Sequence, residues 1–125
     1  METKHKAMIQ ASELRLGNKI NHNGIVCTVL GIDSNSWLQL DNEQLNTRCD
    51  DCEYIHLTEE WLLKAGAQVY KFDHKQSEYR IGNRLIVIRD GYFFDYGTSL
   101  KLEFVHRFQN LFFELQYGKE LEFKL

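Results

Sequence analysis

The sequence contains no proline, only three cysteines and no long hydrophobic run. The absence of proline excludes proline-rich linkers and polyproline docking segments, and it leaves no obvious interdomain hinge. A small, odd number of cysteines is typical of a reducing compartment. No apolar run is long enough to cross a bilayer, and residues 1–17 lack the hydrophobic segment of a secretory signal. We therefore expect a cytoplasmic protein.

The sequence also lacks the signatures of an enzyme. Its five histidines are scattered, no serine or cysteine lies in a nucleophile motif, and no phosphate-binding glycine loop occurs. Cys49 and Cys52 form a C-x-x-C pair, and His56 and Cys27 are candidates for a third and fourth zinc ligand. A zinc ribbon needs a second cysteine pair, however, which this chain does not have. We expect no enzymatic activity, cofactor or metal; metal binding by Cys49, Cys52 and His56 stays open.

The length and composition fit one small domain. The chain has 125 residues, of which 43% are hydrophobic, and this is enough to bury a core. We expect a flexible N-terminus over residues 1–12 and a single α+β domain over residues 13–125. The alternative is a pair of lobes, 13–57 and 67–125, joined by a helix over residues 58–66.

Two-residue turns between Ser77 and Val105 give the strongest structural signal. The three turn pairs are Gly82-Asn83, Asp90-Gly91 and Gly97-Thr98, each flanked by apolar or aromatic residues. Because such pairs supply the positive φ angles that tight hairpins require, they predict a four-stranded antiparallel meander. A two-residue loop at Asp90-Gly91 gives the register Arg89 with Tyr92, Val87 with Phe94, Ile88 with Phe93 and Ile86 with Asp95.

The first half of the chain predicts a second group of strands. Apolar, β-branched residues flank the Asn23-Gly24 pair, and a third short strand over 37–40 follows a turn over 33–36. Three short strands of this kind predict an SH3-like hairpin or half-barrel at the N-terminal end.

Two helices follow from capping residues and hydrophobic spacing. Over residues 57–66, Thr58 is a good N-cap and Gly66 supplies the residue after the helix, which predicts one short helix. The stripe Val105, Phe108, Phe112 and Leu115 predicts a C-terminal helix that ends at Gly118. The residues after it, Leu121–Leu125, predict a closing strand.

Charge is distributed unevenly along the chain. Residues 41–60 hold seven acids against one base, whereas residues 64–89 hold six bases against two acids. The candidate partner-binding acids are Asp41, Glu43, Asp50, Asp51 and Glu53. Because Leu45 is the only large apolar residue among them, we expect an exposed acidic loop that attracts a basic partner.

A second candidate surface combines basic and aromatic residues. It consists of Lys71, Lys75, Arg80, Arg84, Arg89 and Tyr92. Such a mixture is typical of a sheet that stacks bases and contacts phosphates. Core packing explains the aromatic residues more simply, and a pI of about 5.9 is low for a nucleic-acid-binding protein.

Four sequence words together resemble one known family. They are ELRLGN at 13–18, LTEEWLLKAG at 57–66, VHRFQNLFF at 105–113 and GKEL at 118–121. In this order they resemble an uncharacterised family of small prophage and mobile-element proteins of Bacteroidetes. The chain departs from the family pattern with His56 in place of proline and with Ala65 and Ala67 in place of aromatic residues. The resemblance implies a mobile-element setting and no catalytic residue.

These observations give two alternative expectations of function. The first is a non-enzymatic phage-type accessory protein that binds another protein, specifically a basic nucleic-acid-binding effector such as a host defence nuclease of the CRISPR kind. The second is a small RNA- or DNA-binding module that uses the surface of residues 70–96. Neither involves a membrane.

Overall fold

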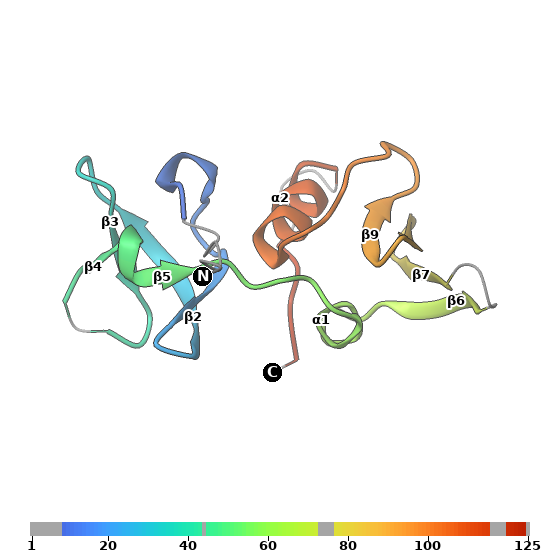
Figure 1. Ribbon diagram of the computed structural model, residues 1–125, viewed down its shortest axis with the longest axis horizontal. Coiled ribbons are helices and arrows are strands. Elements are labelled where there is room, and N and C mark those ends of the chain that lie inside the picture. Colours follow the sequence, from blue (N-terminus) through green and yellow to red (C-terminus); the bar gives the residue numbers. More distant parts are fainter. Residues whose placement is uncertain (1–8, 44, 73–76, 116–119, 125) are drawn as a thin grey trace, which may run out of the picture. The chain divides into compact units, whose positions relative to one another are not determined.

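The computed structural model describes residues 9–43, 45–72, 77–115 and 120–124. Within them the fold is α+β, with two antiparallel sheets of five and four strands and one main helix (Figure 1). The chain divides into two compact units, Met1–Ile55 and His56–Leu125, which we call unit 1 and unit 2. In the described part of the chain, the helices are too short and too polar to span a bilayer.

Unit 1 contains the five-stranded sheet, in the order β4-β3-β2-β1-β5. Its strands are β1 (Lys19–His22), β2 (Ile25–Ile32), β3 (Trp37–Leu40), β4 (Thr47–Arg48) and β5 (Cys52–Glu53). A 3-10 turn, η2 (Cys49–Asp51), joins β4 directly to β5, so the strands at the two edges of the sheet are consecutive in sequence. The hairpin predicted at Asn23-Gly24 is confirmed, because both residues have positive φ, 52° and 78°.

The core of unit 1 follows from the alternation of its strands. Ile20, Val29 and Leu38 have no exposed surface, since they point inward from three neighbouring strands. Residues 1–8 of the expected flexible N-terminus lie outside the described residues. Ile9 is buried, and the turn η1 (Ala11–Glu13) follows it. The Tyr54 hydroxyl accepts a hydrogen bond from the backbone N–H of Gln10, 2.8 Å.

Unit 2 contains the four-stranded sheet, in the order β6-β7-β8-β9. Its strands are β6 (Gln68–Phe72), β7 (Ser77–Ile81), β8 (Arg84–Arg89) and β9 (Tyr92–Asp95). The register predicted across Asp90-Gly91 is confirmed, with Arg89 opposite Tyr92 and Ile86 opposite Asp95. For residues 70–72 of β6, the structure describes the backbone but not the side chains.

The identity of the fourth strand was predicted wrongly. The sequence placed it after Gly97-Thr98, but that segment forms only one isolated bridge, between Phe94 and Lys101. Gly97 does not have the positive φ of a tight hairpin; Ser99 does, at 61°. The backbone of Asp95 accepts a hydrogen bond from Ser99 N–H, 2.7 Å, which closes a wider loop. The fourth strand of the sheet is β6 instead.

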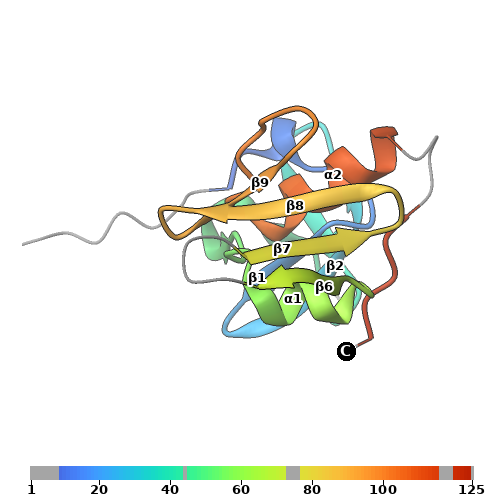
Figure 2. The same cartoon turned by 90° about the vertical axis from the view of Figure 1, so that its right-hand side faces the viewer.

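Two helices cover one face of the unit 2 sheet, as Figure 2 shows behind the strands. In α1 (Glu59–Lys64), the predicted cap is confirmed, because the Thr58 hydroxyl accepts a hydrogen bond from Trp61 N–H. In α2 (Val105–Leu115), Phe108, Leu111, Phe112 and Leu115 face Ile81 and Ile86 of the sheet. The predicted stripe is therefore the packing face of this helix. Its expected end at Gly118 lies outside the described residues.

The predicted closing strand over Leu121–Leu125 is wrong for the described residues 120–124, which form no strand. This segment packs on α1 instead. The rings of Trp61 and Phe123 meet edge to face at 5.2 Å, and Lys124 N–H donates to the Lys64 carbonyl. Leu121 is buried. The alternation of apolar residues in this segment therefore reflects burial. It does not indicate a strand here, because no neighbouring strand forms a ladder with it.

Candidate functional site

The candidate acids do not form the loop that the sequence predicts. Between Asp41 and Glu53 the chain forms β4, η2 and β5, with Thr47, Cys49 and Cys52 buried. The expected exposure is confirmed for Asp41, Asp50, Asp51 and Glu53. The expectation that the whole segment is an exposed loop was wrong, because small residues supply the inward positions and their burial is not evident from hydrophobicity. Asp50, Asp51 and Glu53 lie at the outward positions next to Cys49 and Cys52.

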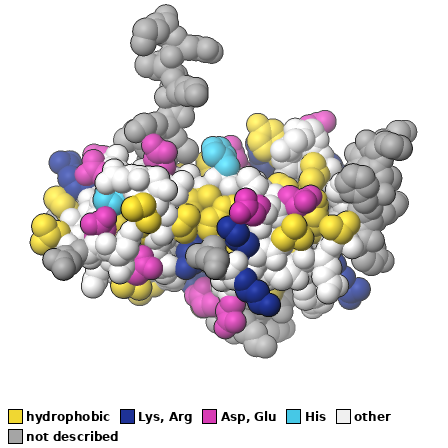
Figure 3. Space-filling view, turned by 90° about the horizontal axis from the view of Figure 1, so that it is seen from below, with side chains coloured by type: hydrophobic (Ala, Val, Ile, Leu, Met, Phe, Trp, Pro, Cys, Tyr) yellow, Lys and Arg dark blue, Asp and Glu magenta, His cyan; other side chains and the backbone are white. Residues whose placement is uncertain are grey.

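The five candidate acids differ in their surroundings. Asp41 accepts a hydrogen bond from Thr28 N–H at 2.9 Å, so it holds the end of β3 against β2. Glu43 lies 3.0 Å from Nδ1 of His22. Asp50, Asp51 and Glu53 are exposed, as is Asp41, and Asp50 lies 3.6 Å from Arg48 Nη2. On the face drawn in Figure 3, acidic side chains lie among polar and hydrophobic ones and do not form one continuous patch.

The excess of acids in the chain lies in unit 1. Residues 1–55 contain eight acids and five bases, whereas residues 56–125 contain ten of each. Unit 1 is therefore acidic and unit 2 is neutral. A basic partner is attracted to unit 1 over a range set by the Debye length, about 10 Å at 0.1 M salt.

The three cysteines of unit 1 are buried and reduced. Burial, with smaller contributions from the nearby Cys49 and Cys27, raises the pKa of the Cys52 thiol to about 12. Burial also raises the pKa of Cys27 and of Cys49. Thiols with raised pKa are poor nucleophiles and metal ligands near neutral pH. Among the residues that the structure describes, no group of three or more His, Cys, Asp or Glu side chains is placed to hold a metal ion.

The candidate nucleic-acid surface is split between the two faces of the unit 2 sheet. Arg80 pairs with Leu85 across β7 and β8, whereas Arg84 pairs with Ile81. Because residues opposite each other share a face, Arg84 lies on the face that α2 covers. Arg80, Arg89 and Tyr92 lie on the other, outer face and are exposed. The side chain of Lys71 and all of Lys75 lie outside the described residues.

Arg84 has a structural partner on the covered face. Its Nη2 lies 2.5 Å from Oδ2 of Asp95, and its Nε lies 3.3 Å from Oδ1. The side chain of Asp95 is only 1% exposed and also accepts hydrogen bonds from the N–H and hydroxyl of Thr98. Burial opposes ionisation of Asp95, but the hydrogen bonds from Arg84 and Thr98 outweigh it and lower the pKa. Arg84 therefore already has a buried carboxylate partner, although it also lines a surface pocket with Arg80. Its contact with nucleic acid stays a prediction.

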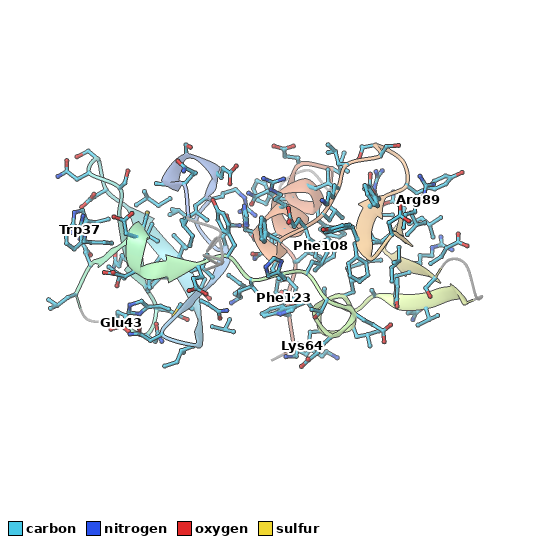
Figure 4. The ribbon with its side chains drawn as sticks, viewed as in Figure 1. Trp37, Glu43, Lys64, Arg89, Phe108 and Phe123 are labelled. Carbon is cyan, nitrogen blue, oxygen red and sulfur yellow. The ribbon has the colours of Figure 1, made fainter. Side chains whose placement is uncertain are left out.

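Sequence reasoning missed a cleft on unit 1. It has a volume of about 380 Å³ and is lined by Asn35, Ser36, Trp37, Arg48, Cys49 and Asp50. Trp37 is 38% exposed, and Figure 4 shows its side chain pointing away from the ribbon of unit 1. The alternation of residues 37–40 contains the signal: Leu38 and Leu40 are buried, so Trp37 and Gln39 point outward. An outward tryptophan beside a cleft is typical of a binding surface.

Comparison with known proteins gives no relative. Scans of protein-family models, curated proteins and solved structures found no match to this chain.

Proposed function

We propose that this protein is a non-enzymatic accessory protein that acts by binding a basic, nucleic-acid-binding protein, specifically a host defence nuclease of the CRISPR kind. The observation that carries the proposal is the acid excess of unit 1, with Asp50, Asp51 and Glu53 exposed on η2 and β5. An acidic surface on a rigid scaffold competes with nucleic acid for a basic groove. The prophage setting rests on the four sequence words given above, and action in the bacterial cytoplasm is part of the same proposal.

We also infer that unit 1 is an SH3-like half-barrel. The strand order supports this inference, because β1 pairs with both β2 and β5, and η2 links the two edge strands. The link through η2 makes the two edge strands of the sheet consecutive in the chain. It also holds the acids of η2 and β5 in fixed positions, which favours recognition by a preorganised surface.

The test measures association and inhibition with a panel of purified CRISPR nucleases. The informative variant is Asp51→Lys with Glu53→Lys, which reverses two exposed acids of unit 1. The control is Glu114→Lys with Glu122→Lys, which makes the same change in net charge at exposed positions of unit 2. We expect the unit 1 variant to associate about tenfold more slowly at low salt, and the control to resemble wild type.

Two results count against the proposal. If wild-type protein neither binds nor inhibits any nuclease of the panel, the nuclease assignment is wrong. If both double variants slow association equally, only net charge matters, and the acids of unit 1 have no particular role.

A second candidate function is single-strand nucleic-acid binding by the outer face of the unit 2 sheet. The observation that favours it is that Arg80, Arg89 and Tyr92 share that face, with Lys101 Nζ 3.6 Å from the Tyr92 ring centroid. Fluorescence anisotropy with a labelled 20-nucleotide strand tests it. Arg80→Glu with Arg89→Glu abolishes salt-sensitive binding if this function is correct, whereas the control Arg107→Glu with Lys124→Glu retains it. Absence of binding by wild type at low salt rules it out.

A further inference from the structure

The cleft beside Trp37 has rigid walls. The Asp33 carboxylate accepts hydrogen bonds from the N–H groups of Asn35, 2.8 Å, and Trp37, 3.0 Å. The Cys49 thiol donates to the Ser36 carbonyl at 2.9 Å and so ties η2 to this turn. Ser36 keeps a positive φ of 64°, which is unfavourable for a residue other than glycine. A surface fixed in this way loses little conformational entropy when a ligand binds.

One guanidinium group already lies in this cleft, and it is held weakly. Arg48 Cζ lies 5.8 Å from the centroid of the Trp37 ring, near the outer limit for a cation–π contact. Arg48 Nη2 lies 3.6 Å from Oδ2 of Asp50, with the side chains 61% and 62% exposed. Exposed pairs of this kind contribute little to stability. A ligand can therefore displace Arg48 from Asp50 at small cost.

The charges around the cleft select a cation. The lining residues include one acid, Asp50, and one base, Arg48, and the Asp33 carboxylate lies in the turn beside them, against the N–H groups of Asn35 and Trp37. Asp33 and Asp50 both lie close enough to Cys49 to raise the pKa of its thiol, after the larger effect of burial. A negative cleft with an exposed indole suits a flat, weakly hydrated cation, and a guanidinium meets both requirements better than an ammonium.

We propose that this cleft binds an arginine side chain of the partner protein, with the guanidinium over the Trp37 indole and paired with Asp50. This inference rests on the proposed function, and in it the arginine is the residue that anchors the partner. Arg48 then turns outward, where its own charge is solvated. Interfaces concentrate their binding energy at such aromatic and arginine contacts, while surrounding acids govern the rate of association.

The experiment uses the full chain, labelled with nitrogen-15, and the peptide acetyl-Gly-Arg-Gly-Arg-Gly-amide. The two indole N–H signals report separately on Trp37, which lines the cleft, and on Trp61, which is buried in unit 2. We expect a saturable shift of the Trp37 signal and no shift of the Trp61 signal. The same peptide with citrulline in place of arginine keeps the shape without the charge, and we expect it to leave both signals unchanged.

Matched variants separate this site from general attraction to acids. Asp50→Asn removes the charge from the cleft, and we expect about tenfold weaker binding of the arginine peptide, as for loss of one charge-assisted contact. Asp51→Asn changes a neighbouring exposed acid that does not line the cleft, and we expect less than a twofold effect. Circular dichroism of both variants checks that the fold is retained.

Several outcomes overturn the assignment. Equal effects of Asp50→Asn and Asp51→Asn, equal binding of the citrulline peptide, or a Trp37 shift caused by a glutamate peptide all contradict it. If the arginine peptide fails while Asp51→Lys with Glu53→Lys still slows nuclease association, the cleft proposal falls and the proposed function stands. If the peptide binds as expected and nuclease association is unaffected, the arginine site stands and the proposed function falls.

Discussion

Replacement of Arg84 by methionine gives a quantitative test of the unit 2 fold. Methionine keeps most of the length of the side chain but removes the cation that pairs with Asp95. Asp95 is fully buried. Asp95 then loses two of its four hydrogen bonds, those from Arg84 Nε and Nη2. Breaking a buried ion pair by removing one partner costs about 3–5 kcal/mol. Because the Arg84 side chain is 23% exposed, we expect the lower end, about 3 kcal/mol.

The assay is urea unfolding followed by circular dichroism at pH 7, with Arg89→Met as the control. Arg89 is exposed at the end of β8, so its replacement changes the free energy of unfolding by less than about 0.5 kcal/mol. Asp95→Asn in the Arg84→Met background recovers part of the loss, because it removes the uncompensated charge. Equal midpoints for Arg84→Met and Arg89→Met refute the assignment of Arg84 to the covered face.

Three further predictions concern other parts of the chain. The pKa of Asp95 is lowered on folding, so its contribution to stability is complete above the ordinary aspartate pKa and is lost as the pH falls through the lower, folded value. We therefore expect the stability difference between wild type and Asp95→Asn to be smaller in acid. Urea titrations at pH 7 and pH 3 measure this difference. Thr58→Ala removes the hydroxyl that accepts from Trp61 N–H, and we expect a loss of about 1 kcal/mol in the same assay, with Thr58→Ser close to wild type. The thiol pKa of Cys52 is raised to about 12, so we expect iodoacetamide at pH 8 to label Cys52 only after urea unfolds the protein. Detection of labelled Cys52 in the folded protein by mass spectrometry contradicts this prediction.

The elements that sequence reasoning predicted correctly depend on local backbone chemistry. Asn23-Gly24 and Asp90-Gly91 require positive φ at both positions, and the structure has it at both. Thr58 and Gly66 bound α1 for similar local reasons, a side-chain acceptor at one end and a φ of 93° at the other. Such constraints are present in a few adjacent residues, so a single sequence contains them.

The elements that it missed depend on contacts between distant residues. β6 exists because it pairs with β7, and no turn pair announces it. The segment after Gly118 was given a strand, but a packing contact between Phe123 and Trp61 and one backbone hydrogen bond place it on α1. Neither outcome follows from local propensity, because the partner decides it.

The candidate surfaces show what the sequence already contained. The Gly82-Asn83 turn, with the register that it implies, puts Arg84 opposite Ile81 and Arg80 opposite Leu85. The placement of Arg84 on the other face of the sheet from Arg80 and Arg89 was therefore available from the sequence. The cleft beside Trp37 was not, because it forms where the turn before β3 approaches η2, 13 or more residues later in the chain.

The association rate with a purified CRISPR nuclease tests the central claim most directly. We measure it at low salt and at 0.5 M salt for wild type, for Asp51→Lys with Glu53→Lys, and for Glu114→Lys with Glu122→Lys. The account predicts a rate about tenfold lower for the unit 1 variant alone, and a difference that disappears at high salt, where charges beyond about 4 Å are screened. Identical rates for all three proteins at low salt contradict the claim that the acids of unit 1 direct this protein to a basic partner.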